Sequence, residues 1–128
     1  LTLFASSSAL DTDFCARLCR VDKTGKSTNL TEGIIRTRFR DSLTNPTLIE
    51  PGRVYEYLID MGPVGARLAP GEQLRITISS SDFPLYDRNL NTGGPLYTEQ
   101  ASAAVLATQS VLHDLKHPSR ITLPVFCP

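Results

Sequence analysis

Hydrophobic side chains recur at every second position over most of this chain. In the cleanest case, Leu74, Ile76 and Ile78 alternate with polar residues. A period of two is typical of half-buried β-strands, because successive side chains of a strand point to opposite faces of the sheet. The pattern predicts strands at residues 1–7, 14–22, 34–40, 53–61, 73–79 and 120–126.

The polarity of each face predicts where a strand lies. Residues 1–7 and 14–22 are apolar on both faces, so we expect central strands. Residues 53–61 place Tyr55, Tyr57, Ile59 and Met61 on one face.

Residues 34–40 carry three arginines, Arg36, Arg38 and Arg40, on one face. We interpret them as a solvated stripe, since acidic side chains are available nearby to neutralise it: Asp41, Glu50 and Glu56. The alternative is an interface with an acidic partner surface.

Turn residues separate the predicted strands. Residues 22–25 resemble a hairpin turn ending in Gly25, and Pro51-Gly52 and Pro70-Gly71 suit type II turns. Many short strands at this spacing predict an all-β fold, an antiparallel β-sandwich or jelly roll, in one domain over residues 1–128. Residues 101–115 fit either a helix or a strand, and we expect mostly strand.

One long segment lacks any periodicity. Residues 82–99, called the 82–99 loop from here on, are rich in Asp, Asn, Gly and Pro. Loops of this length are functional or disordered in most proteins. Because Phe83, Tyr86 and Tyr97 are aromatic, and aromatic residues are scarce in disordered segments, we expect the loop to pack against something.

Charge and composition exclude several classes of partner. Thirteen basic and thirteen acidic side chains in 128 residues give no net charge, and no apolar run approaches the ~18 residues of a membrane span. We therefore expect neither a nucleic-acid nor a membrane partner. The chain opens at Leu1 and its sole methionine is Met61, so we expect a processed or excised piece of a longer protein.

The three cysteines indicate a reducing compartment. Cys15 and Cys19 lie about 13 Å apart along a predicted strand, beyond the ~7 Å reach of a disulfide. A pair with Cys127 stays open, but buried free thiols in a cytoplasmic protein are the preferred interpretation. No Cys or His spacing suggests a zinc site.

A search for catalytic motifs finds none that fits. The closest approach to a serine elbow, residues 25–29, lacks the final glycine and a following helix. Gly93-Gly94-Pro95 is typical of a turn and not of a phosphate-binding loop.

One cluster holds all three residue types of a catalytic triad: His113, Asp114, His117 and Ser119. Pro118 prevents a helix there, and adjacent strand residues point to opposite faces, so we expect a turn with hydrogen-bonding histidines. The histidines have no third metal ligand at a telling spacing. The sequence thus predicts no catalytic, cofactor-binding or metal-binding residues.

Specific strings nevertheless resemble a known family. In order they are DTDF at 11–14, NLTEGI at 29–34, ISSSDFP at 78–84, YDRNLNTG at 86–93 and HPS at 117–119. Together they resemble the C-terminal domain of the cocaine esterase and X-Pro dipeptidyl-peptidase family of serine hydrolases. RTRFR at 36–40 and NPTLIE at 45–50 are similar to the cocaine-esterase branch.

The resemblance implies a jelly roll of the galactose-binding-like type, attached to an α/β-hydrolase domain that carries the Ser-His-Asp triad outside this chain. It implies a non-catalytic accessory role, with that catalytic domain as partner, and no cofactor. The candidate interface lies within the 82–99 loop, at Phe83, Tyr86, Asp87, Arg88, Asn89 and Asn91. We expect Asp87 and Arg88 to act as polar anchors that become buried on docking.

The resemblance also begins partway into such a domain, so the opening strand or strands of the jelly roll are expected to be missing. An exposed sheet edge pairs readily with another chain, so we expect self-association. Two alternatives to the accessory role remain. One is a carbohydrate-binding module, against which the absence of tryptophan argues, and the other is a stand-alone enzyme built on residues 113–119.

Overall fold

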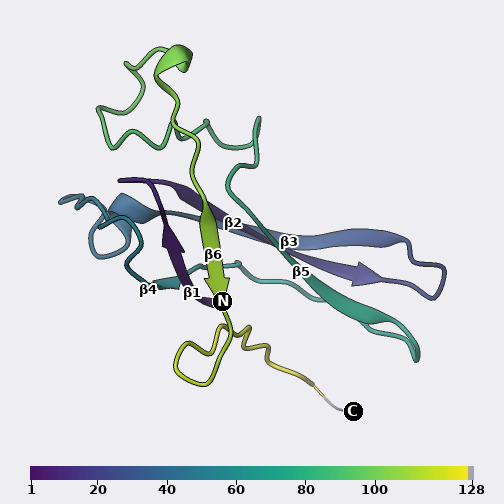
Figure 1. Cartoon of the computed structure of the whole chain (residues 1–128). Coiled ribbons are helices and arrows are strands. Elements are labelled where there is room, and N and C mark those ends of the chain that lie inside the picture. The colour runs from purple at the N-terminus through teal and green to yellow at the C-terminus, as the bar shows by residue number, and fades with distance from the viewer. Residues whose placement is uncertain (127–128) are drawn as a thin grey trace.

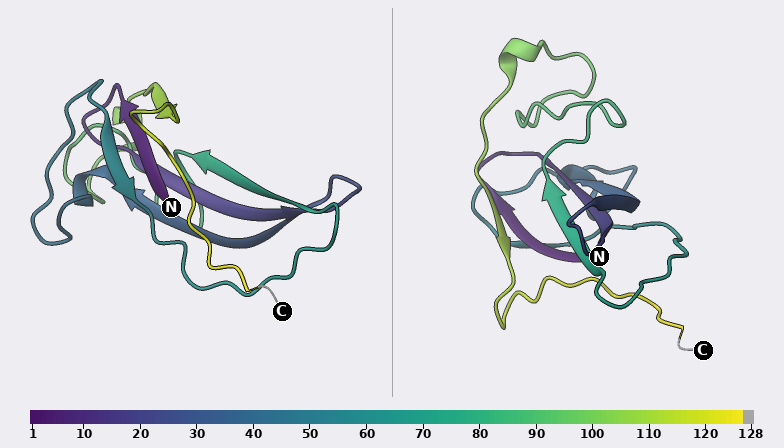
Figure 2. Two further views of the ribbon diagram at one scale, coloured as in Figure 1. Left: turned by 90° about the horizontal axis from the view of Figure 1, so that it is seen from below. Right: turned by 90° about the vertical axis from the view of Figure 1, so that its right-hand side faces the viewer.

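Two antiparallel sheets form the fold. The computed structural model describes residues 1–126, which contain two three-stranded sheets with the strand orders β4-β1-β6 and β3-β2-β5. Figures 1 and 2 show their arrangement. The strands are β1 (Thr2–Ser7), β2 (Asp13–Val21), β3 (Ser27–Arg36), β4 (Tyr55–Leu58), β5 (Gln73–Ser79) and β6 (Gln109–Leu112). This confirms the predicted antiparallel β-sandwich.

The hydrophobic core lies between the sheets. Its buried members come from β1, β2 and the segment that begins in β4: Leu3, Ala5, Phe14, Ala16, Leu18, Tyr57, Ile59 and Met61. The rings of Phe14 and Tyr57 lie 5.2 Å apart across the two layers. Gly33 of β3 allows the segment after β4 to approach, because a Cβ at Gly33 would lie only 2.1 Å from the carbonyl oxygen of Asp60.

Several sequence predictions are confirmed. β1 and β2 are both central in their sheets, as their two apolar faces indicated. β5 covers the predicted residues 73–79. The strand predicted at 53–61 is shorter, at Tyr55–Leu58, yet Tyr57, Ile59 and Met61 are buried as expected. The predicted turn glycines Gly25, Gly52 and Gly71 all have φ between 81° and 86°.

The strand predicted at residues 34–40 is wrong beyond Arg36. β3 ends there, and Thr37–Phe39 form the 3-10 helix η1. The cause is a side chain distant in sequence, because the Thr37 hydroxyl and the Arg38 N–H both donate to Oδ1 of Asp11, at 2.8 and 2.9 Å. These bonds turn the chain away from the strand direction.

The segment 101–115 is mostly not a strand, contrary to expectation. It contains the 3-10 helix η2 (Ala101–Ala103) and the four-residue β6. β6 pairs with Phe4–Ser7 of β1, and the chain then leaves the sheet in a turn before Arg120 bridges Thr2.

The strand predicted at residues 120–126 is also wrong. One bridge joins Arg120 to Thr2, and the following residues have no strand partner in the described part of the chain. Ile121 and Leu123 still pack against the core. Alternating apolar residues can therefore pack on the core without forming a strand, because a strand also needs a neighbouring strand to accept and donate its backbone hydrogen bonds.

Among residues 1–126, no helix is long and apolar enough to cross a membrane.

Candidate functional site

Two arginine–aspartate pairs lie buried where β2 begins and β3 ends. Arg36 donates to both carboxylate oxygens of Asp13, at 2.8 and 2.9 Å. Arg38 donates through Nε to Oδ2 of Asp11 at 2.7 Å. Asp11 is fully buried and Arg38 is 8% exposed. Buried charges are tolerated only when they are paired and hydrogen-bonded, so these pairs form an interdependent cluster.

The interpretation of the arginines as a solvated stripe is therefore wrong. The side chains of Arg36 and Arg38 are each 10% exposed, and their partners are Asp11 and Asp13. Of the expected partners, Asp41 does pair with Arg40, at 3.2 Å. The hydrogen bonds from Arg36 to Asp13 also raise the pKa of that guanidinium, so its charge is fixed.

Asn89 connects the 82–99 loop to this cluster. Its Nδ2 donates to Oδ2 of Asp11 at 2.9 Å and to Oδ1 of Asp13 at 2.8 Å. Its Oδ1 accepts the N–H of Asn91 at 2.9 Å, which holds the next turn of the loop. Asn91 has a left-handed φ of 62° and donates through Nδ2 to the carbonyl of Val105 at 2.9 Å. The middle of the loop is thereby fixed to the sandwich.

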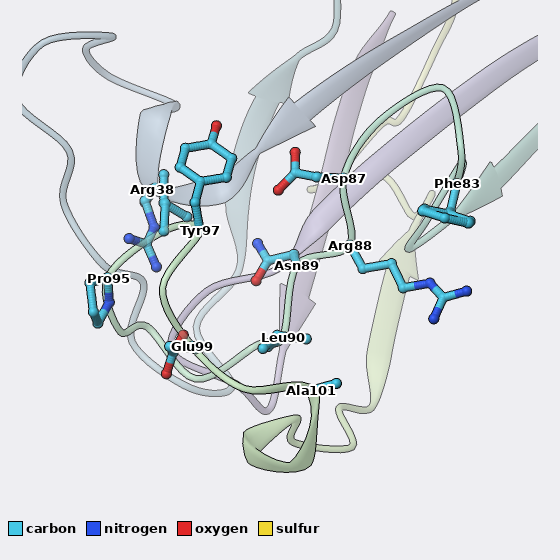
Figure 3. A pocket seen from close by; sticks show the side chains of 11 residues that line it. Arg38, Phe83, Asp87, Arg88, Asn89, Leu90, Pro95, Tyr97, Glu99 and Ala101 are labelled. Carbon is cyan, nitrogen blue, oxygen red and sulfur yellow. The ribbon is translucent and has the colours of Figure 1, made fainter.

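Gly94 also holds the loop, because its carbonyl accepts a hydrogen bond from Arg38 at 2.9 Å, whereas Phe83, Arg88 and Tyr97 are exposed. An open hollow of about 310 Å³ lies between the loop and Arg38. Figure 3 shows the side chains that line it, with Phe83, Arg88 and Tyr97 among them. The Arg88 guanidinium lies 4.3 Å from the centre of the Phe83 ring. Tyr97 is 82% exposed and has a φ of 69°, a conformation that bulky residues rarely adopt. Exposed aromatic residues on a fixed loop are suited to contact another surface.

The predicted interface residues divide into two groups. Asn89 and Asn91 point into the domain and hold the loop, a role that the sequence did not predict for them. Phe83 and Arg88 are exposed, Asp87 is half-exposed and bonds Arg36 at 3.3 Å, and Tyr86 is partly buried. The burial of Asp87 and Arg88 against another domain remains a prediction.

Sequence reasoning missed the acidic half of the cluster, Asp11 and Asp13. The register of the β2–β3 hairpin places Asp13 directly opposite Arg36. Counting outward from the predicted turn at residues 22–25 places Asp13 opposite Ile34, two residues before Arg36. One of these two residues lies in the turn, because the first pair of the hairpin is Val21 and Ser27. The remaining difference is a bulge between Leu18 and Cys19, which no turn signal reveals.

Residues 113–119 form the expected turn. His117 and Asp114 are hydrogen-bonded through Nδ1 at 3.1 Å, and the backbone N–H of His117 also bonds Asp114. Ser119 accepts the N–H of Phe4 at 2.9 Å and donates its hydroxyl proton to the carbonyl of Leu112. Ser119 thus serves to fasten the turn to β1 and β6.

Cys15 and Cys19 are buried and unpaired, as predicted. The pairing considered for Cys127 lies outside the described residues. Within residues 1–126, no three His, Cys, Asp or Glu side chains come together in an arrangement that could hold a metal ion.

Comparison with known proteins gives consistent matches over nearly the whole chain. The sequence model of the X-Pro dipeptidyl-peptidase C-terminal non-catalytic domain matches residues 1–122. The chain is 46% identical over 123 residues to the cocaine esterase of Rhodococcus sp. (strain MB1 Bresler), which covers 96% of this chain and 21% of the esterase. The chain therefore spans about a fifth of the length of this relative.

Two solved structures of hydrolytic enzymes also match this chain. An aminopeptidase from a marine sediment Thaumarchaeota archaeon superposes with a TM-score of 0.87 at 30% identity, covering 91% of this chain and 21% of the aminopeptidase. An α-amino acid ester hydrolase gives a TM-score of 0.79 at 27% identity, covering 86% of this chain and 20% of the hydrolase. The ordered motifs, the β-sandwich and the family match agree: this chain belongs to the family of X-Pro dipeptidyl-peptidase C-terminal non-catalytic domains.

Proposed function

We propose that this chain is the accessory domain of a serine hydrolase, and that its 82–99 loop docks on the catalytic domain of the same polypeptide. The proposal rests on one observation: part of the loop is bonded to the domain, and another part is exposed to solvent. Asn89 fixes its inner side to the buried pairs of Asp11 and Asp13, whereas Phe83, Arg88 and Tyr97 are exposed. A rigid support with an exposed aromatic margin favours recognition of a preformed surface.

The named relatives are an esterase, an aminopeptidase and an ester hydrolase, so domains similar to this one occur in enzymes that act on different bonds. We infer that the catalytic domain determines the bond that is hydrolysed. The reaction would follow the acyl-enzyme route of serine hydrolases, with nucleophile, base and oxyanion donors all supplied by that domain.

The docking surface on the catalytic domain would contain a carboxylate. Within the described chain, the Arg88 guanidinium has an aromatic ring beside it but no acidic partner. A guanidinium held over a ring keeps its N–H groups free to donate, and a carboxylate accepts two of them in parallel. Burial of Phe83 beside this contact would add about 1–3 kcal/mol by the area of apolar surface removed from water.

The substitution Arg88→Ala tests this proposal in the longer protein. We expect it to lower the melting temperature and the hydrolytic activity of the longer protein but to leave the melting temperature of the 128-residue chain unchanged. Arg53→Ala is a control outside the loop, because Arg53 also lies over an aromatic ring, that of Tyr55 at 5.0 Å, and its ion pair with Glu50 is exposed to solvent. Unchanged stability and activity of the longer protein after Arg88→Ala would refute docking through this loop.

The coding sequence upstream of Leu1 provides an independent test. The proposal requires a hydrolase domain there with a serine on a GxSxG-type elbow. An open reading frame without such a domain would contradict the accessory role.

We also propose a cytoplasmic location, supported by the two buried free thiols, and self-association of the isolated chain.

A further inference from the structure

The open hollow beside the 82–99 loop is lined by a buried guanidinium that is not fully paired. Arg38 donates through Nε to Asp11 at 2.7 Å and through Nη1 to the carbonyl of Gly94 at 2.9 Å. Within residues 1–126, Nη2 of Arg38 donates no hydrogen bond, although the side chain is only 10% exposed and lines the hollow. Buried polar groups are normally paired, so the two N–H groups of Nη2 are available to an acceptor that enters the hollow.

A carboxylate without a cationic partner lies next to the same glycine. Oε2 of Glu99 accepts the Thr92 hydroxyl at 2.5 Å, whereas Oε1 accepts no hydrogen bond from residues 1–126. Oε1 lies against the α-carbon of Gly94, where it would overlap an added Cβ. Arg38 bonds the carbonyl of this glycine but forms no ion pair with Glu99, so a free donor and a free acceptor line one hollow. Figure 3 shows both side chains among those that line it.

The charges around the hollow balance. Asp87 and Arg88 add one charge of each sign to those of Arg38 and Glu99. A ligand with a lone negative charge would be attracted by the arginines but repelled by the carboxylates, and the reverse holds for a lone positive charge. A ligand that carries both charges on neighbouring groups pairs with the free donor and the free acceptor together.

Apolar side chains complete the lining. Leu90, Pro95 and Leu96 lie beside the charged groups, together with the ring of Tyr97. The volume of about 310 Å³ is at the lower end of the range for ligand pockets, which is roughly 300–1,000 Å³. The hollow therefore fits a small ligand that carries an apolar group beside its charges.

We propose that this hollow binds a free α-amino acid with an apolar side chain. The α-carboxylate accepts the Nη2 N–H groups of Arg38, the α-ammonium donates to Oε1 of Glu99, and the side chain packs on Leu90 and Leu96. An amino acid carries its two charges on one carbon, which matches two protein groups that both contact Gly94. The site needs no second domain, so it goes beyond the docking role proposed for the margin of the loop.

Titration of the 128-residue chain with L-leucine, followed by NMR, tests the site. We expect saturable shifts of the backbone amides of Gly94, Leu96 and Tyr97, and none in the hairpin turn at residues 23–26. Isocaproate lacks the ammonium of leucine and isoamylamine lacks its carboxylate. Each should bind at least about tenfold more weakly than leucine, because one charge-assisted contact is lost. The series tests the contact with Arg38 without altering a side chain that the buried ion pairs require.

Glu99→Gln tests the second contact, and Glu56→Gln, at an exposed glutamate of β4, is its control. We expect Glu99→Gln to weaken leucine binding at least about tenfold, and to leave isocaproate binding no weaker, since isocaproate has no ammonium to pair with the carboxylate. Glutamine keeps an oxygen that accepts the Thr92 hydroxyl, so a loss confined to leucine distinguishes ligand recognition from support of the loop.

Three results would overturn the inference: no saturable shifts at tens of millimolar leucine, equal affinity for leucine and either analogue, or equal effects of the two glutamine variants. These measurements use the 128-residue chain alone. Their failure would leave the docking proposal standing, and failure of docking would leave this site standing.

Discussion

At the scale of single residues, the side-chain amide of Asn89 joins the 82–99 loop to the buried ion pairs. Asn89 donates to the carboxylates of Asp11 and Asp13, and each carboxylate also binds an arginine. Loss of a partner would leave buried charge under-satisfied, which costs more than the net value of the lost hydrogen bond. The exposed part of the 82–99 loop therefore depends on a residue that is itself partly buried.

Asn89→Ala is expected to destabilise the chain by about 2 kcal/mol, since two charge-assisted hydrogen bonds are lost. The change should be measured as the free energy of unfolding in urea, together with proteolysis of the 82–99 loop, which should become faster. Asn45→Ala, at an exposed loop asparagine, is the control and should change neither quantity. Equal protease resistance in the two variants would show that Asn89 does not hold the loop.

The buried thiol of Cys15 is expected to make the folded chain less stable as the pH rises above about 9. Burial, followed by the charge of Asp13, raises its pKa from 9.0 to about 11. Between these values the folded state holds a proton that the unfolded state has lost, so stability decreases as pH rises. Relative to Cys15→Ala, the wild-type chain should lose roughly 2 kcal/mol of unfolding free energy between about pH 8 and about pH 11. Urea titrations at both pH values measure this, and parallel losses in the two proteins would contradict the assignment.

At the scale of elements, the strands that depend on their own pattern were predictable and those that depend on distant partners were not. β5 follows from local alternation, and β1 and β2 follow from apolar side chains on both faces. The end of β3 does not follow from its own pattern, because the Thr37 hydroxyl donates a hydrogen bond to the carboxylate of Asp11, 26 residues earlier in the chain. Residues 120–126 alternate like a strand, but within residues 1–126 they form only the single bridge from Arg120 to Thr2.

In the candidate site, too, local features could be predicted from the sequence and long-range contacts could not. The 82–99 loop was identifiable from its length and aromatic residues, whereas its attachment through Asn89 required knowledge of which side chains the fold brings together. The partners of Arg36 and Arg38 were missed because residues close in sequence were considered in place of Asp11 and Asp13.

Gly33 lets β3 pack closely against the segment that follows β4. Gly33→Ala would force the Ile59–Asp60 backbone away from β3, because the added Cβ would lie 2.1 Å from the carbonyl oxygen of Asp60. We expect a loss of about 3 kcal/mol in unfolding free energy, the upper part of the range for overpacking. Gly65→Ala is the control, since a Cβ there meets nothing within 4 Å. A loss of stability no larger than that of Gly65→Ala would contradict this prediction, because it would mean that β3 and Ile59–Asp60 can move apart without cost.

At the scale of the whole molecule, the domain presents two surfaces with different characters. The loop margin at Phe83, Arg88 and Tyr97 is polar and aromatic and suits a preformed partner surface. The hollow between the two sheets, beside β5, is lined mostly by aliphatic side chains. Family membership accounts for a scaffold of this kind, because a non-catalytic domain contributes through the surfaces that it offers.

Hydrogen–deuterium exchange gives the most direct test of docking on a catalytic domain. Backbone amides of residues 83–97 should exchange more slowly in the longer protein than in the 128-residue chain, since docking removes them from solvent. Amides of the hairpin turn at residues 23–26, remote from the loop in sequence, should exchange equally in both. Equal exchange of residues 83–97 in the two proteins would contradict the account.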